Sequence, residues 1–144
     1  MISEGARRKF IRDVAMAFFG TGFIENRDLD GIELVWEQDG LTASAAVNAE
    51  EAWVTLTDAA APVESAETAI GLLRSIFADE IVAVAAYEND VWVSQALANA
   101  VDLHRPPHLL VPLDPRQIAR VNRLDVRSWS GALDGTRPWP PEGQ

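Results

Sequence analysis

The chain of 144 residues contains no cysteine. This absence excludes disulfide bonds, thiolate zinc sites and cysteine nucleophiles together. No apolar run approaches the ~20 residues that a membrane-spanning helix needs. Near the N-terminus, Arg12 and Asp13 interrupt the apolar stretch that a signal peptide would require. The sequence therefore predicts a cytoplasmic protein that does not enter a membrane.

Motifs for nucleotide, metal or acyl-transfer chemistry are lacking as well. The glycines form no Gly-x-Gly-x-x-Gly or Walker pattern that would cradle phosphates, and no serine lies in a Gly-x-Ser-x-Gly elbow. His104 and His108 have the separation of a helical metal pair, but Pro106 and Pro107 prevent the helix that would place both rings on one side. We expect no cofactor, no metal and no catalytic residue, which favours a non-enzymatic function over an enzyme.

Basic residues are scarce in the centre of the chain. The formal net charge is −10, and residues 25–102 carry sixteen acidic residues against two arginines. Such a region repels nucleic-acid phosphates and anionic lipids, so neither a nucleic acid nor a membrane is expected as a partner. The negative charge suits a basic protein partner, or it simply keeps a small domain in solution.

Hydrophobic residues make up 48% of the sequence, enough for a core without a metal or disulfide. A chain of this length buries roughly 70% of its unfolded surface as one domain. We expect a single domain over residues 1–134. Residues 135–144 hold three prolines and are expected to form a C-terminal tail.

A β-hairpin is expected over residues 32–47. Ile32, Leu34 and Trp36 alternate with Glu33, Val35 and Glu37, the pattern of a strand with one buried face. Asp39-Gly40 suits a two-residue type I′ turn. Counting back from that turn gives four cross-strand pairs: Gln38 with Leu41, Trp36 with Ala43, Leu34 with Ala45, and Ile32 with Val47. Turn chemistry and facing pattern agree on this register.

The remaining elements follow from periodicity and turn residues. Apolar residues at spacings of three and four predict helices up to Gly20 and over residues 64–78, and Ile118, Val121 and Leu124 predict the buried stripe of a short helix that begins at Asp114. Further strands are expected at residues 52–57, 80–87, 91–97 and 126–129. The 80–97 hairpin pairs Tyr87 with Trp92, Val82 with Leu97 and Val84 with Gln95. The fold class is therefore α+β, with an antiparallel sheet of about five strands in the order α-β-β-β-α-β-β-α and helices packed on one face.

Residues 3–97 resemble the chaperone-like α/β domain of type III secretion chaperones in element order, size and acidity. The resemblance runs through the helix that ends at Gly20, the strands around Ile32, Leu41 and Val54, the helix around Leu73, and the strands around Val82 and Val93. It implies an acidic dimer that holds an extended segment of a cargo protein. The long section after Leu97 departs from that pattern, which expects one closing helix there.

Five tryptophans are many for a chain of this length. The hairpin register assigns Trp36 to the core, whereas tryptophan elsewhere is favoured at protein interfaces because it buries a large area with few torsions. The candidate interface residues are Trp53, Trp92, Trp129, Trp139 and Phe19. We expect a non-enzymatic, acidic, chaperone-like protein-binding module that binds another protein or forms a homodimer.

Two alternatives remain open. Small residues on sheet faces can leave room for a ligand, which would make the chain a small-ligand-binding domain or an enzyme with a pocket between sheet and helices. The residues that suggest such a pocket are Ala43, Ala45, Ala83, Ala85 and Ala96, unless Phe18 and Phe77 fill that space. The other alternative is an immunity or inhibitor protein whose acidity neutralises a basic toxin.

Overall fold

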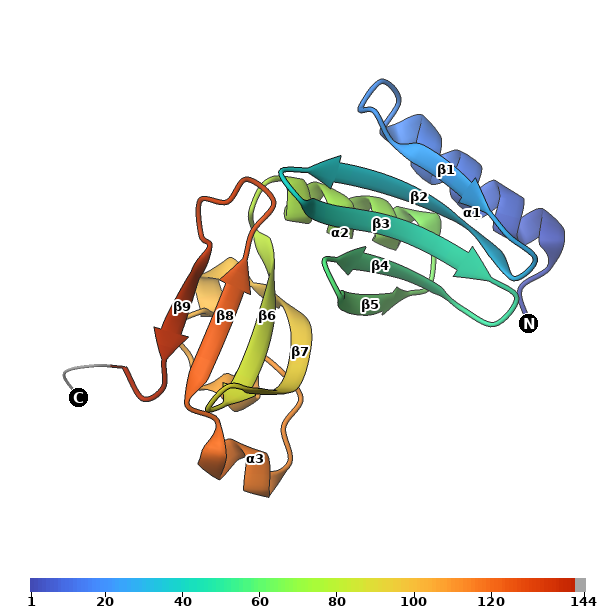
Figure 1. Ribbon diagram of the computed structural model, residues 1–144. Coiled ribbons are helices and arrows are strands. Elements are labelled where there is room, and N and C mark those ends of the chain that lie inside the picture. Colours follow the sequence, from blue (N-terminus) through green and yellow to red (C-terminus); the bar gives the residue numbers. More distant parts are fainter. Residues whose placement is uncertain (142–144) are drawn as a thin grey trace. The chain divides into compact units, whose positions relative to one another are not determined.

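The computed structural model describes residues 1–141, and it confirms the α+β class with antiparallel sheets (Figure 1). Its contacts divide the chain into two compact units, Met1–Ser75 and Ile76–Gln144. In the described part of the chain, no helix is both long enough and apolar enough to span a membrane. The elements in chain order are α1 (Glu4–Ala17), β1 (Ile24–Arg27), β2 (Gly31–Gln38), β3 (Leu41–Asn48), β4 (Ala52–Leu56), β5 (Ala59–Val63), α2 (Ala66–Phe77), β6 (Ile81–Glu88), β7 (Val91–Asn99), the 3-10 turns η1 (Ala100–Asp102) and η2 (Pro107–Leu109), α3 (Pro115–Arg120), β8 (Arg123–Arg127) and β9 (Gly135–Pro138).

The first unit contains a five-stranded sheet in the order β1-β2-β3-β4-β5. All four cross-strand pairs expected for its central hairpin are present. Asp39 and Gly40 have φ values of 48° and 82°, as the turn requires. Leu34 and Trp36 are buried. The turn chemistry thus fixes which face of the sheet carries the apolar residues.

Helix α1 packs against β2 and β3. Ser3 caps its first turn, because its Oγ accepts a hydrogen bond from the backbone N–H of Ala6 at 3.1 Å. The expected apolar stripe is buried at Phe10, Ile11, Val14 and Phe18. The guanidinium of Arg74 on α2 lies 6.0 Å from the ring centroid of Phe18, which places α2 beside the end of α1.

The edge strand β5 was not expected, because no strand was predicted between residue 57 and the helix over residues 64–78. Thr57 adopts a φ of 54°, which lets the chain reverse directly after β4. Pro62 pairs with Trp53 in the sheet. An edge strand tolerates proline because one side of the strand has no partner that needs an N–H donor.

The second unit contains its own four-stranded sheet, in the order β7-β6-β8-β9. The expectation of one sheet for the whole chain was therefore wrong. Alternate residues of β6 and β8 pack against the irregular segment that runs from η1 to the end of α3. This second core consists of Val82, Val84, Ala86, Leu103, Leu110, Val111, Val121, Leu124 and Val126.

The predicted pairing of the β6–β7 hairpin was only partly correct, because the register shifts within it. Tyr87 pairs with Trp92 as expected, but Val82 pairs with Ala98 and Val84 with Ala96. The pairing shifts by one residue between Ala86 and Tyr87. A bulge inserts one residue on one strand only, so every pair beyond it moves by one position.

The end of the chain also differs from expectation. Asp114 and Gln117 form the predicted capping box, but α3 ends at Arg120, so Ile118 is exposed and Leu124 lies in β8. Residues 135–138 were assigned to the tail, yet they form β9 and pair with β8. A four-residue strand with a glycine and a proline has no periodicity from which it could be recognised.

Candidate functional site: a groove between α1 and β1

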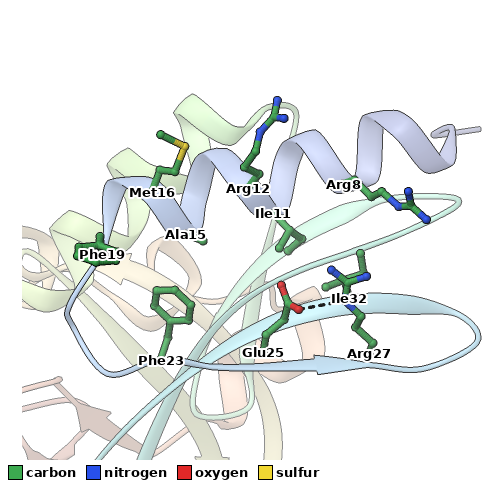
Figure 2. Close-up of a pocket in the computed structure, with 10 residues that line it drawn as sticks. All are labelled: Arg8, Ile11, Arg12, Ala15, Met16, Phe19, Phe23, Glu25, Arg27 and Ile32. Carbon is green, nitrogen blue, oxygen red and sulfur yellow. Dashed lines mark hydrogen bonds and ion pairs between the residues drawn. The ribbon is translucent and has the colours of Figure 1, made fainter.

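A groove of about 320 Å³ lies between α1 and β1 in the first unit. Figure 2 shows Phe23 and Glu25 pointing toward α1, while Arg12 and Met16 extend away from β1 at the rim. The volume is at the lower end of the ~300–1,000 Å³ typical of ligand pockets. The lining residues are Arg8, Ile11, Arg12, Ala15, Met16, Phe19, Phe23, Glu25, Arg27 and Ile32.

The sheet register explains how the two walls form. Glu25 pairs with Leu34 and Arg27 pairs with Ile32, so these two charged residues share the face that carries the buried side chains of β2. β1 is exposed along its whole length. The helix therefore covers β2 and β3 but leaves the face of β1 open, and the groove lies at this margin.

Exposed apolar side chains mark one end of the groove. Phe19 is 90% exposed although it directly follows the buried Phe18, and Met16, between the buried Val14 and Phe18, is 70% exposed. Phe23 is half-buried, and its ring centroid lies 5.6 Å from that of Trp36 in an edge-on arrangement. This end of the groove therefore presents apolar side chains next to the buried Trp36.

Charged side chains occupy the rest of the rim. The Nη2 of Arg8 lies 2.6 Å from Oε1 of Glu4, and the Nε of Arg27 lies 3.0 Å from Oε2 of Glu25. Three arginines and one glutamate line the groove itself. The groove thus combines apolar side chains with groups that can form ion pairs.

Metal binding was not expected from the sequence. Within residues 1–141, no group of three or more His, Cys, Asp or Glu side chains is placed to hold a metal ion.

Lys9 donates a hydrogen bond to Asp13 on the exposed side of α1, and this bond holds the pKa of Asp13 below its usual value of 3.8. Asp13 does not line the groove.

The five predicted interface residues are not gathered in one place. Phe19 lines the groove. Trp53 pairs with Ala46 on the opposite face of the same sheet and lines a separate cavity there. In the second unit, Trp92 is 52% exposed next to Tyr87, Trp129 packs against Phe77 with ring centroids 5.0 Å apart, and Trp139 is half-buried. A role at an interface remains a prediction for all five.

Sequence reasoning did not single out Met16, Phe23 or Arg27. Met16 lies off the apolar stripe, and Arg27 belongs to a strand of four residues. The only signal was Phe19, an aromatic residue at the edge of an amphipathic stripe. The five alanines that suggested a pocket line neither this groove nor the cavities at Trp53 and Trp139.

Comparison with known proteins adds no family to this description. No protein-family model, curated protein or solved structure matches the chain.

Proposed function

We propose that this chain is a non-enzymatic, cytoplasmic protein-binding module that holds an apolar segment of a partner protein in the α1–β1 groove, as a chaperone holds its cargo. The observation that carries the proposal is the exposure of Phe19 and Met16 beside a concave surface. Large apolar side chains that adjoin one another on a surface are typical of interaction sites, whereas scattered ones are not.

The charged residues at the rim of the groove indicate which charges the bound segment carries. The acidic centre of the chain suggested a basic partner. However, charges farther than about 8 Å from a bound segment are largely screened from it at physiological ionic strength. Arg8, Arg12 and Arg27 are at the groove itself. We therefore expect the bound segment to combine apolar residues with nearby carboxylates.

Side-chain contacts, not strand addition, are expected to hold the segment. β1 is an edge strand, yet it is only four residues long and carries Glu25 and Arg27. Short, charged edge strands resist pairing with another strand. The bound segment would instead place apolar side chains against Phe19, Phe23 and Met16.

A pull-down with matched variants tests this proposal. Phe19→Glu places a charge at the groove, while Leu109→Glu places the same charge on an exposed apolar residue of the second unit. We expect one protein from the native lysate to be captured equally by the wild type and Leu109→Glu, and at least tenfold less by Phe19→Glu. Circular dichroism of each variant checks that the fold is intact.

Two results would contradict the proposal: equal capture by Phe19→Glu and the wild type, or capture of no protein at all. Light scattering during size-exclusion chromatography separates a foreign partner from a second copy. A 15.7 kDa monomer at high concentration would exclude the homodimer. If the wild type is a dimer and Phe19→Glu is a monomer, the segment bound in the groove belongs to a second copy of this chain.

A further inference from the structure

A further cavity, of about 380 Å³, lies within the second unit. It is formed by the segment after η1, by β8, and by the chain from β9 to Pro141. Five of its lining residues are apolar or aromatic, and the other two, His104 and Arg137, are polar. The lining residues are Leu103, His104, Leu124, Arg137, Pro138, Trp139 and Pro141.

The position of Arg137 follows from the sheet register. Arg137 pairs with Leu124, so both side chains leave the sheet on the same face. Leu124 is buried in the second core. The arginine of the edge strand β9 therefore lies on the face that its neighbours use for apolar packing, at the margin of that core.

Arg137 differs from the arginines of the adjacent strand in its electrostatic partners. Arg123 forms an ion pair with Asp125 at 3.3 Å, and Arg127 forms one with Asp134 at 3.4 Å. Within residues 1–141, no carboxylate lies within ion-pairing distance of Arg137. A guanidinium beside apolar surface is complementary to an anion, and to a carboxylate in particular, because the two groups match in geometry.

His104 supplies a second polar group. Its Nδ1 lies 3.0 Å from the carbonyl oxygen of Val101. Because a carbonyl oxygen only accepts hydrogen bonds, Nδ1 is the donor. This contact orients the ring, and Nε2 remains for a ligand or for solvent.

Trp139 supplies the aromatic surface. Its backbone N–H donates a hydrogen bond to the carbonyl oxygen of Asn122 at 2.9 Å. The side chain of Asn122 in turn forms two hydrogen bonds with Asn89 in the β6–β7 turn. Its Oδ1 accepts from the backbone N–H of Asn89 at 2.8 Å, and its Nδ2 donates to Oδ1 of Asn89 at 3.1 Å. The backbone that carries the indole is therefore fixed to two neighbouring strand ends, and the half-buried ring can hold a flat or aliphatic group against Leu103 and Leu124.

We infer that this cavity is a binding site for a small apolar carboxylate, with its aromatic or aliphatic body on Trp139 and its carboxylate facing Arg137. The volume falls in the lower part of the ~300–1,000 Å³ range of ligand pockets, which limits the ligand to a small molecule. This site lies within the second unit and does not depend on the groove of the first.

Isothermal titration calorimetry tests the inference with 4-phenylbutyrate and its uncharged counterpart 4-phenylbutan-1-ol. Loss of a charge-assisted hydrogen bond weakens binding by about tenfold or more, so the carboxylate is expected to bind at least about tenfold more tightly than the alcohol. Arg137→Gln should abolish this preference. Arg116→Gln, an exposed arginine of α3 that does not line the cavity, should preserve it.

An NMR titration locates the bound probe. The indole N–H signal of Trp139, identified by its loss in Trp139→Phe, is expected to shift more than those of the other four tryptophans. Both measurements use the full chain, and the spectra show whether each variant is folded. Equal affinity for carboxylate and alcohol, a preference that survives in Arg137→Gln, no saturable binding at millimolar probe, or shifts centred away from Trp139 would each overturn the inference.

Discussion

The indole Nε1–H of Trp36 donates a hydrogen bond to the hydroxyl oxygen of Thr21 across 2.9 Å. The hydroxyl of Thr21 in turn donates to the carbonyl oxygen of Phe18 at 2.6 Å. The ring of Trp36 also packs edge-on against Phe18 and Phe23, at centroid distances of 5.5 Å and 5.6 Å. One buried tryptophan of β2 thus holds the loop that carries the apolar end of the groove.

Replacing Thr21 with valine should loosen this anchor. The change keeps the shape of the side chain but removes both hydrogen bonds of the hydroxyl, and a bond of this kind contributes about 1 kcal/mol to stability. We expect the free energy of unfolding in urea to fall by about 1–2 kcal/mol. Thr42→Val on β3 is the control, because the hydroxyl of Thr42 forms no hydrogen bond with any residue from 1 to 141. An equal loss in both variants would show that the bond to Trp36 is unimportant.

Replacing two glycines, Gly71 and Gly31, with alanine should change the free energy of unfolding in opposite directions. Gly71 lies on the exposed side of α2, and a Cβ there would meet nothing within 4 Å. Because alanine favours the helix over glycine by up to about 1 kcal/mol, Gly71→Ala should raise the free energy of unfolding by about 0.5–1 kcal/mol.

A Cβ on Gly31, in contrast, would lie 2.5 Å from the backbone carbonyl oxygen of Val47. The paired strand must move to admit it, so Gly31→Ala should lower the free energy of unfolding by about 1–3 kcal/mol. Urea unfolding of both variants measures the difference. A stabilising Gly31→Ala would mean that β2 and β3 separate at this end more easily than their pairing indicates.

Local chemistry explains which parts of the fold could be predicted from the sequence. The β2–β3 hairpin was predicted correctly because a two-residue turn at Asp39-Gly40 fixes every pair that follows. The β6–β7 hairpin was predicted only as far as Tyr87 and Trp92, because nothing in the residues marks the bulge beyond them. Strand β9 was missed because its pairing with β8 depends on tertiary contacts.

The candidate groove was less accessible to sequence reasoning than the fold. Phe19 could be recognised, since it lies beside a helical stripe. Arg27 and Glu25 could not, because their position in the groove beside α1 depends on the register of β1 against β2. Likewise, the cavity around Trp139 requires the pairing of Arg137 with Leu124, residues that are 13 positions apart in the sequence.

The cross-strand contact between Arg123 and Tyr87 should contribute to the stability of the second unit. The guanidinium carbon lies 4.1 Å from the ring centroid of Tyr87, and Nη1 lies 3.0 Å from a carboxylate oxygen of Asp90. A double-mutant cycle with Arg123→Gln and Tyr87→Leu should give a coupling energy of about 0.5–1 kcal/mol. The same cycle with Arg116→Gln in place of Arg123→Gln should give a value near zero. Similar coupling in both cycles would assign the effect to Tyr87 alone.

Lys9 and Asp13 provide a test that depends on pH. The hydrogen bond from Lys9 lowers the pKa of Asp13, so the interaction stabilises the folded chain above the unfolded pKa near 3.8 and is lost as the pH falls through the folded value. In Lys9→Met, an NMR titration of the Asp13 carboxyl group should show its pKa rising toward 3.8. Arg8→Met should leave the pKa of Asp13 unchanged, because Arg8 pairs with Glu4. If the Asp13 titration curves of the wild type and Lys9→Met coincide, the hydrogen bond is not the cause of the lowered pKa.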